Sequence, residues 1–240
     1  MSMHLDSTHR SRPPWDQEVI GTDTRTRILS TAKVPFRYIC KLQADPAVGN
    51  CTGTVVAGNK VLTAAHCVTS VAAADITVIP AKRAAGTTAS AEPFGRVGVT
   101  RIDFNAGFTS CGDRDYAVLT LSKSVASTVG TWPRMSAMDP AKIRSIKKVN
   151  LAGFPRDLNA VGDHMYWTYD DVVTAAGATL EYEHDTFSGM SGAPIWIRWQ
   201  NVRTIIGIHQ CADQPGAPVG NKGLLFTTPV LADIATWIRT

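Results

Sequence analysis

The 240-residue sequence lacks several features that would place it in a specialised class of protein. It contains no run of about 18 apolar residues, the length that a membrane helix needs, so we expect no membrane association. It has no cluster of Lys and Arg with interleaved aromatic residues, and its net charge is only +4. We therefore expect no nucleic-acid partner. It also has no internal repeat and no low-complexity segment.

The cysteines lack the spacing of common metal and redox motifs. None of the five forms a CxxC pair, which argues against a zinc ribbon or a thioredoxin-type site. Cys51, His66 and Cys67 would make only a weak metal site, and no metal is expected. Disulfide bonds are the better interpretation, and they indicate an oxidising compartment. The cysteines are Cys40, Cys51, Cys67, Cys111 and Cys211.

Residues 1–18, MSMHLDSTHRSRPPWDQE, lack the apolar core of a signal peptide. They are polar and contain Pro13 and Pro14, which predicts a disordered leader, a pro-segment or a cloning remnant. If the protein is exported, as its cysteines indicate, the signal has been removed or lies outside this sequence. We expect a secreted or periplasmic protein.

Short strand-like segments dominate the rest of the chain. Runs such as FRYICKLQ, CTGTVVAG, YAVLTL and VRTIIGIHQ are rich in β-branched and aromatic residues and are separated by turn signals, which predicts an all-β fold. The exception is PVLADIATWIRT, which places Leu231, Ile234, Trp237 and Ile238 on one face of a C-terminal helix. A polar, proline-containing region at 122–142 predicts two β units, 19–130 and 131–240.

Three residues stand in contexts suited to catalysis. His66 follows the strand VLTAA, Asp115 precedes the strand YAVLTL, and Ser191 lies in the glycine-rich turn DTFSGMSGAP. Taken singly, each fits an ordinary structural role at a strand end or in a turn. Together they supply a nucleophile, an imidazole that takes its proton, and a carboxylate that orients the imidazole. This constellation predicts a site at the junction of the two units.

Two other classes of protein could also place a serine in a glycine-rich turn. An α/β-hydrolase needs its serine before the acid and the histidine, with a helix directly after the serine. The order here is His, Asp, Ser, and an apolar strand follows Ser191. A non-catalytic binding module built on the same fold remains the alternative, although all three catalytic positions are filled.

The chain resembles the chymotrypsin-type serine peptidases, and most closely their bacterial glutamyl endopeptidase branch. The resemblance rests on the blocks CTGTVVAGNKVLTAAHC, DYAVL, DTFSGMSGAP and IIGIH, and on VIGTDTRTRI near the start of the family's mature chains. It implies two six-stranded antiparallel β-barrels with a C-terminal α-helix, 19–130 carrying His66 and Asp115 and 131–240 carrying Ser191. It also implies a zymogen, protein or peptide substrates, a monomer and no cofactor.

The resemblance assigns roles to particular residues. His66 would be the general base, Asp115 its orienting carboxylate and Ser191 the nucleophile, with the backbone amides of Gly189 and Ser191 as the oxyanion hole. Many relatives carry an Asp where this chain has Met190. That Asp pairs with the new N-terminus on activation, so this switch is missing here.

The specificity residues implied by the family are Thr186 and His209, whose hydroxyl and imidazole would bind the carboxylate of a Glu substrate. Val19 would help through an α-amino group released by cleavage after Glu18. Asp185 occupies the place of the carboxylate that binds Arg or Lys in tryptic enzymes, so Arg/Lys specificity stays open as an alternative. We favour cleavage after Glu, with Asp slower.

The resembled fold also suggests how the cysteines pair. Cys51 and Cys67 bracket the histidine loop, so they form one expected disulfide. Cys111 and Cys211 would both border the substrate cleft and form the second. Cys40, inside an apolar strand, is left as a buried free thiol.

Overall fold

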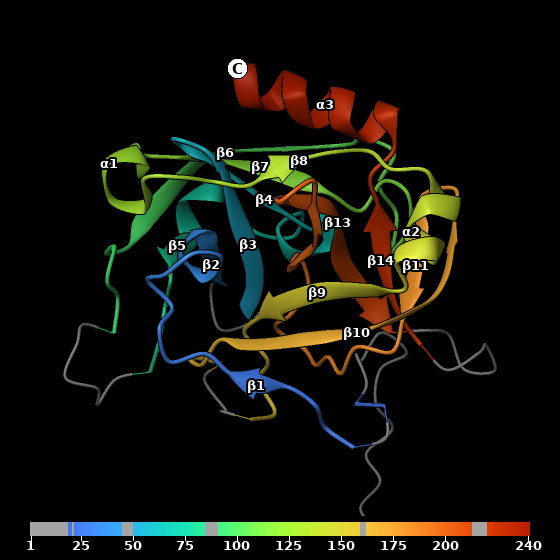
Figure 1. Ribbon diagram of the computed structural model, residues 1–240. Helices are drawn as coiled ribbons and strands as arrows, with labels where there is room; N and C mark the ends of the chain where they lie inside the picture. The colour runs from blue at the N-terminus through green and yellow to red at the C-terminus, as the bar shows by residue number, and fades with distance from the viewer. Residues whose placement is uncertain (1–18, 21, 45–49, 85–90, 159–161, 213–219) are drawn as a thin grey trace, which may run out of the picture.

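The structure is a computed structural model that describes residues 19–20, 22–44, 50–84, 91–158, 162–212 and 220–240. Figure 1 shows two β-barrels packed side by side, with the C-terminal helix α3 (Thr228–Arg239) lying across one end. The expected all-β class with two six-stranded antiparallel barrels and a terminal helix is confirmed. The predicted leader, 1–18, lies outside the described residues.

The first barrel closes on itself in the order β2-β3-β4-β7-β6-β5. Most of its strands are buried along nearly their whole length, and only β6 alternates between buried and exposed residues over its first half. Closure pairs every strand on both sides and leaves no exposed sheet edge. The strands are β2 (Ile39–Gln43), β3 (Asn50–Ala57), β4 (Lys60–Thr63), β5 (Thr77–Pro80), β6 (Val97–Phe104) and β7 (Ala117–Leu121).

The second barrel runs β9-β10-β11-β14-β13-β12 and closes where β9 pairs with both β10 and β12. The short strand β8 (Arg134–Met135) pairs in parallel with β13. The barrel strands are β9 (Lys148–Gly153), β10 (Tyr166–Ala176), β11 (Thr179–Tyr182), β12 (Pro194–Trp199), β13 (Val202–Ala212) and β14 (Asn221–Leu225).

The residues that follow the leader join the second barrel, although they precede the first in sequence. Strand β1 (Thr26–Arg27) pairs with β10, with Thr26 opposite Trp167. The chain that connects β7 to β9 contains helices α1 (Ala126–Val129) and α2 (Pro140–Ile146). The boundary predicted near residue 130 falls in this connection and stays a prediction.

Helix α3 begins at a threonine cap and packs one apolar face against the core. The hydroxyl of Thr227 accepts a hydrogen bond from the amide of Val230. Ile234 is fully buried, and Leu231, Trp237 and Ile238 pack against the same core, as the helical spacing predicts. Within the described residues, no helix is both long and apolar enough to cross a membrane.

Helix α3 also supports the segment that carries Asp115. The hydroxyl of Tyr116 donates to the carboxylate of Asp233 at 2.6 Å, and its ring lies 5.4 Å from that of Trp237. The last element of the chain therefore braces a residue next to a candidate catalytic group in the first barrel.

Candidate active site

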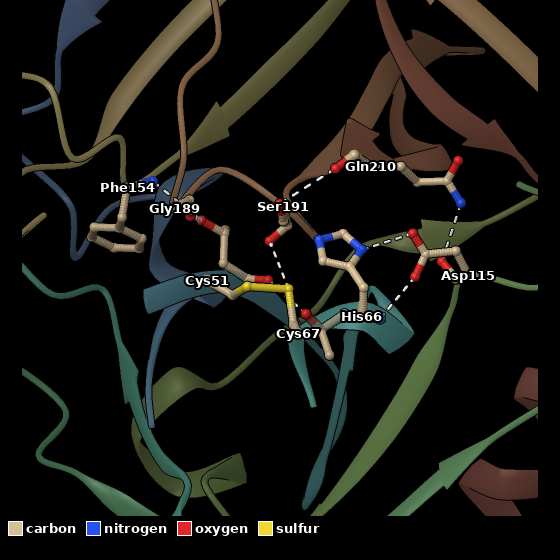
Figure 2. The surroundings of a disulfide bond; sticks show 10 residues. Cys51, His66, Cys67, Asp115, Phe154, Gly189, Ser191 and Gln210 are labelled. Atoms are coloured by element: carbon tan, nitrogen blue, oxygen red, sulfur yellow. Dashed lines mark hydrogen bonds and ion pairs between the residues drawn. A yellow bond between two sulfur atoms is a disulfide. The ribbon is translucent and has the colours of Figure 1, made fainter. Parts of the chain in front are cut away.

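The three candidate catalytic residues meet between the barrels. His66 lies on the short 3₁₀ helix η2 (Ala65–Cys67) after β4, Asp115 directly precedes β7, and Ser191 lies in the turn before β12. In Figure 2 the imidazole of His66 lies between Ser191 and the carboxylate of Asp115. Residues 125 positions apart in sequence are thus brought together, as expected from the motifs.

Asp115 fixes His66 through both of its carboxylate oxygens. Oδ2 lies 2.8 Å from Nδ1 of the ring, and Oδ1 accepts the backbone amide of His66 at 2.9 Å. Because a carboxylate only accepts, Nδ1 carries the proton and Nε2 is left as an acceptor. Burial lowers the pKa of His66, but the hydrogen bond and charge of Asp115 outweigh it, so the pKa is raised above its ordinary value.

Gln210 is a positioning residue that the sequence analysis missed. Its side-chain amide donates to the carbonyl of Gly112 at 2.7 Å and to that of Asp115 at 3.2 Å. The backbone carbonyl of Gln210 accepts a hydrogen bond from the hydroxyl of Ser191 at 3.3 Å. One residue of β13 therefore contacts both the loop of the acid and the nucleophile, and no sequence pattern marked it.

The turn around Ser191 requires glycine at two positions. Gly189 has φ +102°, and a Cβ there would lie 2.3 Å from the carbonyl oxygen of Phe154. Gly192 has φ +80°, and a Cβ would lie 2.2 Å from the hydroxyl of Thr63. Among the described residues no acceptor binds the amide of Gly189, which leaves this donor available to a substrate oxygen.

Thr52 fastens this turn to the first barrel. Its hydroxyl donates to the carbonyl of Gly189 at 2.8 Å and accepts the amide of Phe154 at 3.1 Å. Its backbone amide donates to the carbonyl of Ser191 at 2.9 Å. The preceding residue, Cys51, is joined to Cys67 beside His66, so one segment of β3 holds both the nucleophile turn and the histidine turn.

The structure forms one of the two expected disulfides. Cys51 and Cys67 are bonded, with Cα atoms 6.1 Å apart, and Cys40 is a buried free thiol as expected. The second expected bond is not formed, since Cys111 and Cys211 are both free. Their segments are neighbours, as the resemblance implied, but the two thiols are joined by a hydrogen bond and not by a covalent bond.

The two expected pocket residues are fully buried and carry polar atoms without partners. Among the described residues neither Oγ1 of Thr186 nor Nε2 of His209 has a hydrogen-bond partner. Leaving such a group unsatisfied costs roughly 1–3 kcal/mol. Two neighbouring segments therefore hold unused hydrogen-bonding capacity that a polar ligand would satisfy.

Tyr182 and His184, which the sequence analysis missed, form the wall behind His209. The hydroxyl of Tyr182 lies 2.5 Å from Nδ1 of His209, and its ring meets that of His184 edge to face. Tyr182 ends β11 and His184 lies two residues beyond it, so no strand pattern in the sequence pairs the two side chains.

The electrostatics of this wall keep His209 neutral. Burial, followed by the proximity of His184, lowers the pKa of His209 to about 3, and burial does the same for His184. Burial also raises the pKa of Tyr182 well above its ordinary value. Tyr182 and His209 are therefore both neutral and share the hydrogen bond at Nδ1, and among the described residues Nε2 is the ring atom left without a partner.

Asp185 is occupied by the residues that follow the leader. Its carboxylate accepts the amide of Ile20 at 2.7 Å and both the amide and the hydroxyl of Thr24, at 2.6 and 2.8 Å. Arg25 anchors the same segment through Asp23 and Asp157. Val19, 37% exposed, precedes the bound amide of Ile20.

Comparison with known proteins decides the family. A family model described as Trypsin matches residues 29–238. The chain belongs to the trypsin family. This trypsin-family chain is a serine protease of the chymotrypsin type, and protein or peptide substrates follow from that family.

Two curated relatives align with most of this trypsin-family chain. A glutamyl endopeptidase of Bacillus licheniformis is 27% identical over 92% of this chain and 69% of its own. An extracellular metalloprotease of Bacillus subtilis is 31% identical over 91% of this chain and 69% of its own. The two names belong to different catalytic classes, so the site chemistry is inferred from this chain's own residues.

Solved structures agree on the architecture. A Glu endopeptidase solved in complex with MPD has a TM-score of 0.75 and 25% identity, and the match covers 92% of this chain and all of the other. A thermostable serine protease from an extremophilic microorganism has a TM-score of 0.67 at 17% identity, over 85% of this chain and 98% of its own. The second likeness concerns the fold alone.

Thr52→Val should destabilise the fold and impair catalysis, because valine has the same shape but neither donates to Gly189 nor accepts from Phe154. We expect a loss of about 1–3 kcal/mol in the free energy of unfolding and a fall of up to about 10²-fold in kcat/KM as the turn shifts. Denaturant unfolding and peptide hydrolysis measure the two effects.

Thr54→Val is the matched control, because this buried threonine lies on the same strand and its hydroxyl has no partner among the described residues. It should be neutral or slightly stabilising. Equal effects of the two substitutions would show that the hydroxyl of Thr52 does not hold the nucleophile turn.

Proposed function

We propose that the protein is an endopeptidase that cleaves after Glu, and more slowly after Asp, through an acyl-enzyme on Ser191. The observation that carries the specificity is the pair of buried, unpartnered polar atoms, Thr186 Oγ1 and His209 Nε2. A substrate carboxylate accepts from both, whereas an apolar side chain would leave both unsatisfied.

The reaction follows from the geometry of the triad. Nε2 of His66 takes the proton of the Ser191 hydroxyl as its oxygen attacks the scissile carbonyl carbon. The charge of Asp115 stabilises the imidazolium that forms. The amides of Gly189 and Ser191 stabilise the oxyanion, and His66 then gives its proton to the leaving amine, which leaves an ester on Ser191 for water to hydrolyse.

The specificity pocket works with neutral donors on this proposal. Thr186 donates a hydroxyl and His209 donates Nε2–H, since burial holds its pKa near 3. Asp fits less well than Glu because its shorter side chain leaves the carboxylate short of these donors. The neutral donors supply hydrogen bonds but no positive charge, which leaves a role for a nearby cation.

Val19 is our candidate for that cation. An enzyme that cuts after Glu would release its own leader at Glu18–Val19, and the new α-amino group has an ordinary pKa of about 7.7 to 8.0. The contacts of Asp185 with Ile20 and Thr24 hold this end of the chain beside the segment that carries Thr186. Position 190 is a methionine buried in the core of the second barrel, and a methionine has no carboxylate with which the new terminus could pair.

Arg/Lys specificity is the weaker alternative. It needs a free carboxylate at Asp185, and both oxygens of Asp185 already accept hydrogen bonds from residues 20–24. Asp185 is only 1% exposed and both of its oxygens are already paired, so it is a poor receptor for a substrate cation. A non-catalytic role is disfavoured by the intact hydrogen bonds between His66 and Asp115.

The setting in which the enzyme works follows from its relatives and cysteines. We propose a secreted enzyme, in keeping with the extracellular relative and with the Cys51–Cys67 bond. That it acts as a monomer, without nucleic acid or membrane, stays a prediction.

The specificity is tested by digesting a denatured protein mixture and sequencing the new termini. Cleavage should follow Glu, then Asp. His209→Ala should lower kcat/KM for Glu peptides by about 10- to 100-fold, the value of one hydrogen bond to a charged group, and should change Gln peptides far less. His164→Ala, a partly exposed histidine before β10, serves as the control. Cleavage after Arg or Lys by the wild type would instead make Asp185 the selector.

The pH dependence separates His209 from Val19. Activity requires neutral His66, so it should rise with pH through a pKa above the ordinary value of 6.5. Because His209 is neutral throughout, the ratio of kcat/KM for Glu and Gln peptides should stay level from about pH 5.5 to 7 and fall only as the α-amino group deprotonates near about 8. A collapse of this ratio near pH 6.5 would mean that a protonated His209 binds the substrate.

A further inference from the structure

A free thiol lies against the catalytic histidine and aspartate. Cys111 Sγ, a ring nitrogen of His66 and a carboxylate oxygen of Asp115 all lie within 4.8 Å of one another. We propose that these three side chains form an inhibitory site for a thiophilic divalent cation of the zinc or cadmium type.

The donor set matches the chemistry of such ions. Thiolate, imidazole and carboxylate are the three protein ligands that Zn²⁺ takes, and three of them leave its fourth tetrahedral position open to water. Cys111 is exposed and His66 is partly exposed, so an ion can reach the site from solvent. The buried Asp115 brings a negative charge that offsets part of the charge of the cation.

Binding and inhibition follow without any redox change. The thiol of Cys111 releases its proton to solvent, and the thiolate sulfur donates its electron pair to the ion. Binding through Nε2 of His66 blocks the general base, and binding through Nδ1 removes the hydrogen bond to Asp115. Either contact stops the transfer of the proton from Ser191, and a chelator that removes the ion restores it.

Two other clusters of metal-ligating residues carry no such inference. The group of Cys51, His66 and Cys67 has both sulfurs in a disulfide bond. In the group of Asp170, Asp171 and Glu183, Lys148 already forms ion pairs with the first two carboxylates, at 3.8 and 3.2 Å.

The test uses Cd²⁺ with the full-length protein and reads binding and activity separately. One Cd²⁺ per chain should produce the ultraviolet absorption of a cadmium–thiolate bond and inhibit peptide hydrolysis, and a chelator should reverse both. The loss of activity rests on the proposed role of His66, whereas the absorption does not depend on catalysis.

Three cysteine variants identify the thiol that binds Cd²⁺. Cys111→Ser should keep its peptidase activity, lose the absorption and weaken Cd²⁺ inhibition by at least about tenfold. Cys40→Ala, in the interior of the first barrel, should behave as the wild type does. Cys211→Ser should also stay sensitive to Cd²⁺. This substitution leaves Cys111 in place and removes the thiol with which Cys111 could form a disulfide bond.

The outcomes that overturn the proposal are specific. Inhibition of Cys111→Ser at the same Cd²⁺ concentration as the wild type would place the ion elsewhere. Absence of the thiolate absorption from Cys211→Ser would show that Cys111 takes no ion even when no disulfide with Cys211 can form.

Discussion

The hydrogen bonds of Thr52 are the constraint on which the candidate site depends. A serine protease of this type draws its nucleophile from one barrel and its base from the other, so a small sliding of the barrels would separate them. Thr52 prevents this by bonding the carbonyls of Gly189 and Ser191 across the interface. The neighbouring disulfide from Cys51 to Cys67 ties the same strand to the turn of His66. Gln210 adds a second tie from the opposite side, between the nucleophile and the loop of Asp115.

In contrast to the catalytic turn, the proposed pocket contains buried polar groups that have no hydrogen-bond partner among the described residues. Tyr182 hydrogen-bonds Nδ1 of His209, and among the described residues Nε2 has no partner. The hydroxyl of Thr186 is equally without a partner among the described residues. Such a site is costly when empty and selective when filled, because a ligand without acceptors leaves the cost in place. On the proposed function, the same argument lets a neutral histidine serve as a receptor for a carboxylate.

The sequence was informative wherever a residue type leaves a local trace. Runs of β-branched and aromatic residues predicted the strands, the spacing of Ile234 and Trp237 predicted the terminal helix, and the glycines at 189 and 192 marked the tight turn. Contacts between distant segments left no such trace. Asp185 looked like a substrate receptor, yet it binds Ile20 and Thr24, some 160 residues earlier, because β1 joins the second barrel. The Cys111–Cys211 bond was expected because the resembled fold brings the two segments together, and proximity alone does not distinguish a bonded pair from the two free thiols found here.

The central claim is that Ser191 is an activated nucleophile whose pocket selects a carboxylate. It is tested most directly with peptidyl phosphonates that react covalently with activated serines, one carrying a glutamate side chain and one a lysine side chain. Mass spectrometry should find the adduct on the peptide that contains Ser191, formed faster with the glutamate analogue and absent from Ser191→Ala. Labelling that is absent, that persists in Ser191→Ala or that is faster with the lysine analogue would contradict the account.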